Sequence, residues 1–119
     1  MSVQNVRVEF IRPKYKNLKM WMSDTNNVYI GRGGVVFVDK ERFPRQDSIF
    51  ANPYKIGKDG TRQDVLNKYK QYIEEKINSD KNYLDNLLLL EGKNLGCWCH
   101  PEPCHGDILL DFIKKLKKK

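Results

Sequence analysis

The sequence predicts an α/β fold, a small single-domain Rossmann-like sandwich with a mostly parallel sheet. Short apolar runs come early in the chain, helical periodicities come late, and one further strand-like run lies between two predicted helices. The 119 residues suffice for one domain with a modest core that needs no disulfides. We therefore expect a single domain over residues 1–113, followed by a basic tail over residues 114–119.

The N-terminal part of the chain predicts a strand and then a polar segment. Val6, Val8 and Phe10 alternate with charged residues, which is the period of a half-buried strand, and we expect this strand to end near Pro13. Residues 13–27 are mostly polar and carry several lysines and asparagines. We interpret them as a lid or as an extra N-terminal hairpin.

Two more short strands are expected before the middle of the chain. Residues 28–30 form an apolar run that stops at a glycine-rich turn over residues 31–34, and residues 35–38 are apolar enough for another strand. Prolines and glycines interrupt residues 39–60, so we expect this stretch to be irregular.

Two helices are predicted next. Thr61 reads as a helix N-cap with Asp64 three residues later, an arrangement related to the capping box. Apolar residues then recur at helical spacing as far as Ile77, and we expect the tyrosines among them to belong to the core. Asp80 should cap a second, shorter helix that Gly92 closes.

The C-terminal third predicts a strand and a last helix. Residues 94–99 have the length and composition of a buried strand, and residues 106–116 return to helical periodicity. The longest apolar run, residues 87–90, is much too short to span a bilayer, so we expect no membrane partner.

The net charge and the number of cysteines limit the classes of protein to which this chain can belong. The net charge is +7, and five of the 22 basic residues lie in the tail, which would attract nucleic acid although such tails are more often solvated ends. An odd number of cysteines and the lack of an apolar leader predict a reducing, cytoplasmic location. Nothing in the pattern specifies an oligomeric state or a particular substrate.

The most informative feature is a cluster that holds all three cysteines and both histidines within residues 97–105. Chemistry that needs a thiolate, an imidazole or a soft metal ligand must therefore take place there. The first two cysteines should share one face of the predicted strand, whereas Cys104 and His105 begin the last helix. Amides at a helix start favour anions and lower the pKa of a thiol, so we expect a ligand phosphate or carboxylate on the amides of residues 104–107.

Three interpretations of the cluster remain open. The first is a zinc site, although the cysteine spacing is unlike that of paired zinc knuckles, with ligands drawn from Cys97, Cys99, Cys104 and either His100 or His105. The second is catalytic, with Cys104 as a thiolate nucleophile, or with His105 and Asp107 as acid, base or hydrogen-bonding groups. The third is structural, because buried cysteines usually act as small hydrophobic residues. Cys104 and His105 fit the third interpretation less well, since they lie between prolines and a helix start.

Residues 92–109 resemble the signature of the family named domain of unknown function 4326, which comprises small proteins of phages, large viruses and bacteria. The signature joins Cys-Trp-Cys to a later Cys-His-Gly-Asp, and each of its positions is filled here. Residues 28–32, 50–54 and 60–69 also match. The family name carries no activity, and the resemblance implies an α/β fold and a site at the cluster.

The matched segments predict the walls of a pocket beside the cluster. Arg32 has a planar fork suited to phosphate or carboxylate, Asn52 is either a turn residue or a ligand contact, and Arg62 fits its helix start poorly unless an anion lies nearby. We expect ligand-binding roles for Arg32, Asn52, Arg62, Cys99 and Gly106, and catalytic roles for Cys104, His105 and Asp107.

These residues predict a protein that binds a phosphate-bearing small molecule, such as a nucleotide or a nucleotide derivative, and that hydrolyses or transfers it. The arginines and helix amides would hold the anion, Cys104 and His105 would be the reactive pair, and Asp107 would orient His105 or a ligand hydroxyl. Two alternatives are a zinc-stabilised nucleic-acid-binding protein that uses its basic tail, and a viral inhibitor that sequesters a signalling nucleotide.

Overall fold

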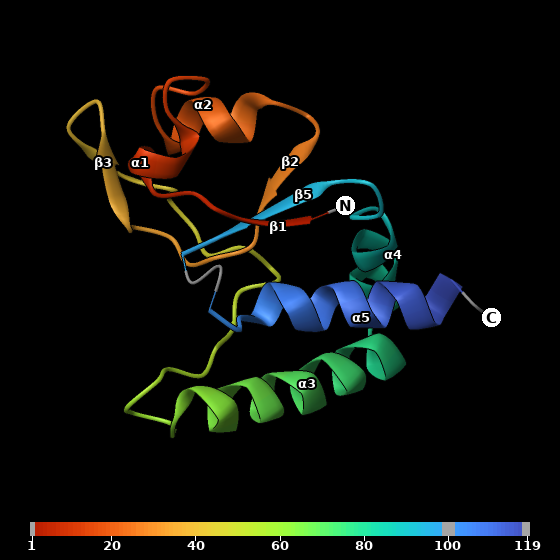
Figure 1. Cartoon of the computed structure of the whole chain (residues 1–119). Coiled ribbons are helices and arrows are strands. Elements are labelled where there is room, and N and C mark those ends of the chain that lie inside the picture. The colour runs from red at the N-terminus through yellow and green to blue at the C-terminus, as the bar shows by residue number, and fades with distance from the viewer. Residues whose placement is uncertain (1, 99–101, 118–119) are drawn as a thin grey trace.

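The centre of the molecule is a three-stranded parallel sheet with the strand order β1-β5-β2 (Figure 1). The computed structural model describes residues 2–98 and 102–117. The sheet strands are Ser2–Asn5 (β1), Asn27–Tyr29 (β2) and Asn94–Cys97 (β5). The late strand β5 thus lies between two early ones, and the carboxyl ends of all three strands meet at one edge of the sheet.

Helices and one antiparallel hairpin complete the part of the chain that the structure describes. The two N-terminal helices are short, and the three C-terminal ones are longer. In chain order the elements are α1 (Val8–Ile11), α2 (Leu18–Ser23), β3 (Val36–Val38), β4 (Glu41–Phe43), α3 (Arg62–Ser79), α4 (Lys81–Leu88) and α5 (His105–Lys117).

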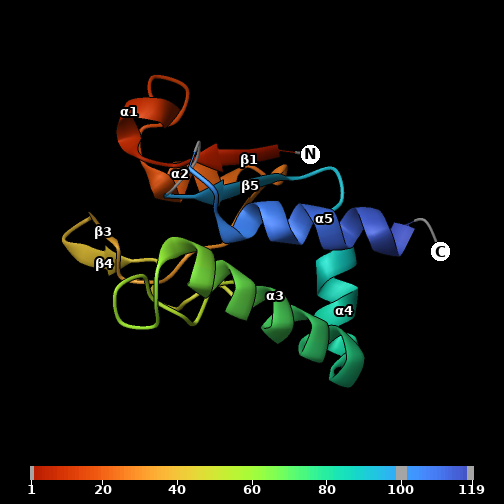
Figure 2. The ribbon, with the colours of Figure 1, turned by 60° about the horizontal axis from the view of Figure 1, so that its bottom comes forward.

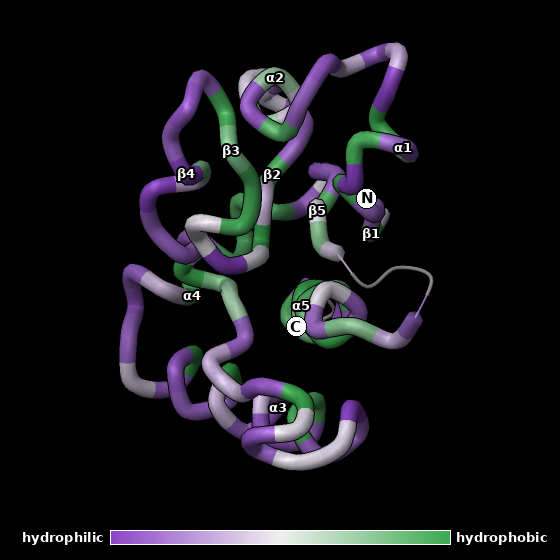
Figure 3. Tube along the Cα trace, turned by 90° about the vertical axis from the view of Figure 1, so that its left-hand side faces the viewer, coloured by the Kyte–Doolittle hydropathy of each residue, from purple (hydrophilic) through white to green (hydrophobic). Residues whose placement is uncertain are grey.

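The helices cover both faces of the sheet. On one face α1 and α2 bury a small core around Trp21, and on the other face α5 packs on the strands with α3 and α4 beside it (Figure 2). Figure 3 looks along α5 and shows it between the sheet and α3. The larger core lies on this second face and includes Ile30, Tyr69, Ile73, Leu87, Leu95, Leu109 and Ile113.

The expectation of a strand over residues 6–10 is wrong. The strand ends at Asn5, Val6 adds one backbone hydrogen bond to Cys97, and the chain then turns into α1. Val8 and Phe10 are 44% and 61% exposed, so their alternation does not mark a buried face. A four-residue edge strand needs few buried side chains, and β1 therefore leaves little period-two pattern in the sequence.

The expectation of an extra hairpin over residues 13–27 is also wrong, because α2 lies there, whereas the alternative of a lid stays a prediction. The side chain of Asn17 caps this helix by accepting a hydrogen bond from the Met20 amide at 3.0 Å. The hairpin is instead formed by β3 and β4, and β4 belongs to the stretch expected to be irregular. Asp39 and Lys40 at its tip have φ angles of 52° and 68°, as a tight two-residue hairpin turn requires.

The remaining elements follow the sequence closely. Thr61 and Asp64 form the full reciprocal capping box of α3, and Asp80 caps α4. The last helix runs to Lys117, so the lysines expected to form a tail are helical as far as that residue. No helix in residues 2–98 or 102–117 combines the length and apolarity needed to cross a membrane.

Candidate functional site

A cavity of about 430 Å³ lies at the carboxyl ends of β2 and β5, beside the first turns of α3 and α5. We call it the phosphate pocket, after the ligand that the sequence predicts there. Of the sequence-predicted site residues, its walls bring together Arg32, Asn52, Arg62, Cys104 and His105. Lys55 adds a third positive side chain, and the described lining contains no Asp or Glu. Much of the remaining wall is apolar and includes Val35, Tyr54, Ile56, Val65, Leu66 and Trp98.

Arg32 and Asn52 build one wall of the phosphate pocket. Arg32 Nη2 donates hydrogen bonds to the carbonyl oxygens of Asn52 at 2.9 Å and Tyr54 at 3.0 Å. The Asn52 side chain accepts from the Tyr54 amide at 2.9 Å and donates to the Val65 carbonyl at 3.3 Å. Asn52 therefore acts as a turn residue that ties the loop to α3, and Arg32 holds the same loop from the turn that follows β2.

His105 is held by the end of β2. Its Nε2 lies 2.7 Å from the Ile30 carbonyl oxygen, and because a carbonyl only accepts, Nε2 carries the proton and Nδ1 is left as the acceptor. The Tyr69 ring meets the imidazole edge-on at 5.2 Å between centroids. Burial lowers the pKa of His105, against an opposing effect of the Ile30 hydrogen bond. The imidazole is therefore neutral at pH 7.

Of the two roles expected for Asp107, the orientation of His105 falls to the Ile30 carbonyl instead, and the orientation of a ligand hydroxyl stays a prediction. Asp107 Oδ2 instead accepts a hydrogen bond from the Cys104 amide at 3.1 Å, and the Gly106 amide donates to Cys104 Sγ at 3.3 Å. Together these bonds form a reciprocal helix cap in which a sulfur replaces the usual hydroxyl. The sequence signal for this cap was the Cys-x-x-Asp spacing of Cys104 and Asp107 at the helix start.

Because of these hydrogen bonds, the start of α5 does not have the anion-binding role that we expect from the sequence. The amides of Cys104, Gly106 and Asp107 are all bonded within the protein, the last of them to the Cys104 carbonyl at 3.0 Å. Gly106 does not line the phosphate pocket, and a Cβ there would lie 3.0 Å from Ile30 and Val3. Glycine thus permits close packing of α5 on the sheet, and these three amides are not open to an anion.

Cys104 is a buried thiol rather than an exposed one. Its Sγ donates to Cys97 Sγ at 3.3 Å, and the two residues are only 3% and 1% exposed. This hydrogen bond and burial raise the pKa of the Cys104 thiol, opposite to the lowering expected at a helix start. The geometry therefore favours a structural role for the Cys104 sulfur over that of a thiolate nucleophile.

The zinc interpretation draws on residues of which only some are described. Within residues 2–98 and 102–117, no three His, Cys, Asp or Glu side chains are grouped as metal ligands. Cys99 and His100 lie outside the described residues. Cys99 is also one of the expected ligand-binding residues.

Arg62 connects the two helix starts that border the phosphate pocket. Its Nη1 donates to the Pro103 carbonyl at 3.1 Å, and its Nε lies 4.0 Å from a carboxylate oxygen of Glu102. The side chain is 36% exposed, so this ion pair is weak. Arg62 thus remains within reach of a ligand at the mouth of the pocket.

The sequence interpretation missed an aromatic pair beside the phosphate pocket. Trp98 Nε1 donates to the Tyr29 hydroxyl at 2.7 Å, and that hydroxyl donates to the Arg32 carbonyl at 2.7 Å. The two rings meet edge-on at 6.4 Å between centroids. The sequence signal for this pair was the position of Trp98 between two cysteines of the motif. Because side chains alternate along a strand, Trp98 points to the face opposite the thiol of Cys97.

Comparison with known proteins identifies relatives without an assigned activity. The model of a family described as a domain of unknown function (DUF4326) matches residues 14–115. An uncharacterized 12.4 kDa protein of Enterobacteria phage T4, from the nrdA-td intergenic region, is 38% identical over 64 residues, which cover 53% of this chain and 59% of that protein. An uncharacterized protein of Acanthamoeba polyphaga mimivirus is 31% identical over 104 residues, which cover 77% of this chain and 70% of that protein. No solved structure matches.

Proposed function

We propose that this chain, which belongs to the family described as a domain of unknown function (DUF4326), binds a phosphate-bearing small molecule such as a nucleotide or nucleotide derivative. One observation carries the proposal. Arg32, Lys55 and Arg62 surround the phosphate pocket, whose described lining holds no Asp or Glu, and the one ion pair of Arg62, with Glu102, is long and solvent-exposed. The pocket also lies at the carboxyl edge of a parallel sheet, where Rossmann-like domains bind their ligands.

The size and composition of the pocket fit a nucleotide. A volume of about 430 Å³ is within the usual range for small-molecule sites. Arg62 and Lys55 meet the phosphate at the mouth, where their side chains are accessible. The apolar wall that includes Tyr54 and Trp98 receives the base or sugar.

The proposal extends to hydrolysis or group transfer with His105 as the base. A water or substrate hydroxyl donates to Nδ1, its oxygen attacks the phosphorus, the bond to the leaving oxygen breaks, and the proton moves to Nδ1. The neutral imidazole and the tautomer set by Ile30 support this role. Cys104 acts as a positioning residue, since its cap holds the first turn of α5 in place.

A thermal-shift screen with nucleotides and inorganic phosphate tests binding. A ligand that binds only the native state stabilises it by about 2.7 kcal/mol at one hundred times its Kd, so we expect the melting temperature to rise. Arg62→Ala should reduce this shift, whereas the control Arg45→Ala should keep it, because the Arg45 side chain is 84% exposed and does not line the pocket. If no phosphate compound shifts the wild type, the proposed binding is wrong.

Turnover is tested with the nucleotide that gives the largest shift. Product formation that His105→Gln abolishes, with binding retained, supports the base role of His105. Binding without product formation would overturn the proposed chemistry and favour sequestration of the nucleotide.

A further inference from the structure

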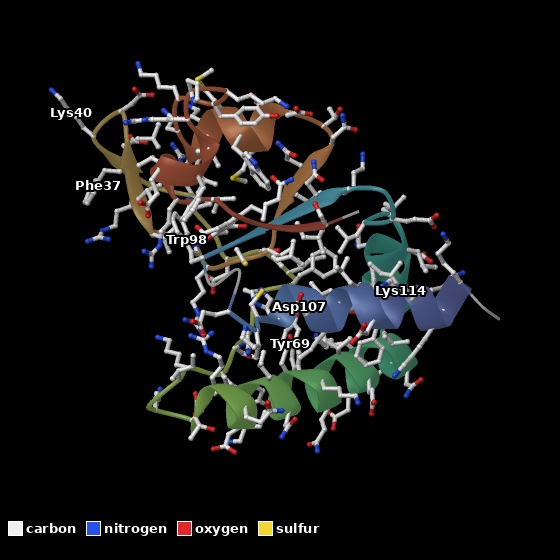
Figure 4. All side chains as sticks on the ribbon, viewed as in Figure 1. Phe37, Lys40, Tyr69, Trp98, Asp107 and Lys114 are labelled. Carbon is white, nitrogen blue, oxygen red and sulfur yellow. The ribbon has the colours of Figure 1, made fainter. Side chains whose placement is uncertain are left out.

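A second cavity of about 690 Å³ adjoins the phosphate pocket, and the two share Trp98 as a common wall. We call it the hairpin groove, because α1 and the segment after it line one side and β3 of the hairpin lines the other. Figure 4 shows Trp98 at the carboxyl end of β5, on the side of the molecule where Phe37 of β3 lies. The two cavities therefore meet at Trp98, and a ligand that reached from one to the other would pass over this side chain.

Trp98 is suited to stacking against a ligand that crosses it. Its indole N–H is already bonded to Tyr29, so the side chain offers its apolar ring surface rather than a free donor. The bond and the edge contact with the Tyr29 ring also fix the indole in one orientation. Fixed aromatic rings of this kind are the platforms on which bases of single strands stack.

The hairpin groove has a surplus of positive charge beyond the phosphate pocket. Arg7, Arg12 and Lys16 line it, against Glu9 and Asp39. Asp39 lies 3.8 Å from Lys19, so part of its charge is offset outside the groove. The two cavities together present six basic lining residues and two acidic ones among the residues described, which complements a ligand with several phosphates.

A second aromatic residue stands at the far side of the hairpin groove. Phe37 is 67% exposed, and the Arg42 guanidinium lies 4.9 Å from its ring centroid. An exposed aromatic ring with an arginine on it offers a further stacking position and a nearby cation.

Lys114 and Lys117 near the C-terminal end of α5 are too distant to serve these cavities. Lys114 lies toward the end of α5 opposite to Trp98 (Figure 4), and a 13-residue helix spans about 20 Å. Lys117 also pairs with Glu91 at 2.5 Å. The positive charges that adjoin the site are therefore those of Arg7, Arg12 and Lys16, not those of Lys114 and Lys117.

We propose that the ligand is the end of a single-stranded nucleic acid that occupies both cavities. Its terminal phosphate lies in the phosphate pocket, a base stacks on Trp98, and the following phosphates pass along Arg7, Arg12 and Lys16. The inference rests on the proposed function, because the phosphate pocket holds the terminal nucleotide. It goes further by assigning oligonucleotide ends as the preferred ligand over free nucleotides.

Fluorescence anisotropy with a 5′-phosphorylated hexanucleotide labelled at its 3′ end tests this, with the unlabelled nucleoside monophosphate as competitor. The wild type should bind the hexanucleotide at least about tenfold more tightly than the monophosphate, since added phosphate contacts and stacked bases both contribute. The double variant with Arg7→Glu and Lys16→Glu should weaken hexanucleotide binding about tenfold or more. Because two phosphate contacts are lost, the magnitude of the slope of log K against log salt should fall by about 1.4. Monophosphate binding should stay within about twofold, because the phosphate pocket is unchanged.

The matched control is Lys81→Glu with Lys114→Glu, which changes the net charge equally at exposed positions on α4 and α5. If both double variants weaken the hexanucleotide to the same degree, binding is merely electrostatic and the proposed path is wrong. Trp98→Leu should weaken hexanucleotide binding, whereas Trp98→Phe, which retains a ring, should preserve most of it. Equal affinity of both Trp98 variants and the wild type would also overturn the proposal.

The two proposals fail in different ways. If the monophosphate binds and the hexanucleotide binds no tighter, the oligonucleotide inference is wrong and the proposed function stands. If the monophosphate does not bind and Arg62→Ala leaves hexanucleotide binding unchanged, the phosphate pocket is not the site and both proposals are wrong.

Discussion

His105 Nε2 and the Ile30 carbonyl oxygen lie 2.7 Å apart, although the two residues are separated by 75 positions in the chain. The contact joins the first turn of α5 to the residue that follows β2. It thereby fixes the imidazole at the end of β2, where it lines the phosphate pocket, and it leaves Nδ1 as the acceptor. The reactivity that we propose for His105 depends on this single bond.

The first prediction concerns the protonation of His105. Because burial lowers its pKa below the ordinary value of 6.5, the unfolded state binds the proton more readily than the native state. Its contribution to stability is therefore complete above pH 6.5 and is lost as pH falls through 6.5 toward the folded pKa. Nitrogen-detected NMR of the imidazole should show a proton on Nε2, none on Nδ1, and a pKa below 6.5.

The chain has a second histidine, His100, so the NMR assignment needs a control. His100→Gln leaves one imidazole signal. The free energy of unfolding of His100→Gln should exceed that of the double variant His100→Gln, His105→Gln, and this difference should shrink as pH falls from 7 to 5. A native pKa of 6.5 or higher for His105 would contradict the prediction.

Asp107 should matter for stability more than for chemistry. Asp107→Ala removes the acceptor for the Cys104 amide, and loss of a helix cap costs about 1 kcal/mol of unfolding free energy. Asp111→Ala, one turn later on α5, changes an exposed carboxylate and should cost less. Thermal unfolding and the nucleotide-induced shift should be measured for both variants. Unchanged stability with a lost nucleotide shift would show instead that Asp107 contacts the ligand.

Gly96 in the central strand should not tolerate a methyl group. A Cβ there would lie 2.5 Å from the Trp21 ring and 2.6 Å from a Val6 methyl, and both side chains are 1% exposed. Overpacking of this kind costs about 1 to 3 kcal/mol, so urea unfolding of Gly96→Ala should show a loss in that range.

Trp21→Phe provides the coupled control for Gly96→Ala. The smaller ring removes the atoms nearest the added methyl group, so the double variant should lose less stability than the sum of the two single losses. Simple additivity would mean that the sheet shifts to accommodate the alanine.

Arg32 should stabilise the loop at residues 52–54 as well as attract anions. Arg32→Ala removes two charged hydrogen bonds to carbonyl groups and should cost about 2 kcal/mol in urea unfolding. Amide hydrogen exchange at Tyr54 should become faster, because its bond to the Asn52 side chain depends on the same loop. Arg45→Ala is the exposed control and should change stability by less than about 0.5 kcal/mol. Unchanged Tyr54 exchange would mean that Arg32 does not hold the loop.

The sequence alone determined the elements whose signals lie within a few residues. Thr61 with Asp64 specifies the start of α3, and Asp80 specifies that of α4, because capping bonds join backbone and side chains three positions apart. The junction of a late strand with a last helix at Cys104 and His105 was readable for the same reason. Local signals misled near the N-terminus, where Val8 and Phe10 alternate without being buried, and at β4, which lies in a stretch expected to be irregular.

Only the tertiary structure decided which segments meet. The placement of β5 between β1 and β2, the bond from Arg62 to Pro103 across 41 positions and the bond from Trp98 to Tyr29 across 69 positions all depend on long-range pairing. The same long-range pairing gave His105 the Ile30 carbonyl as its partner in place of Asp107, whose bond to the Cys104 amide is local. Such choices are set by the free energy of packing the whole chain, which no short run of residues encodes.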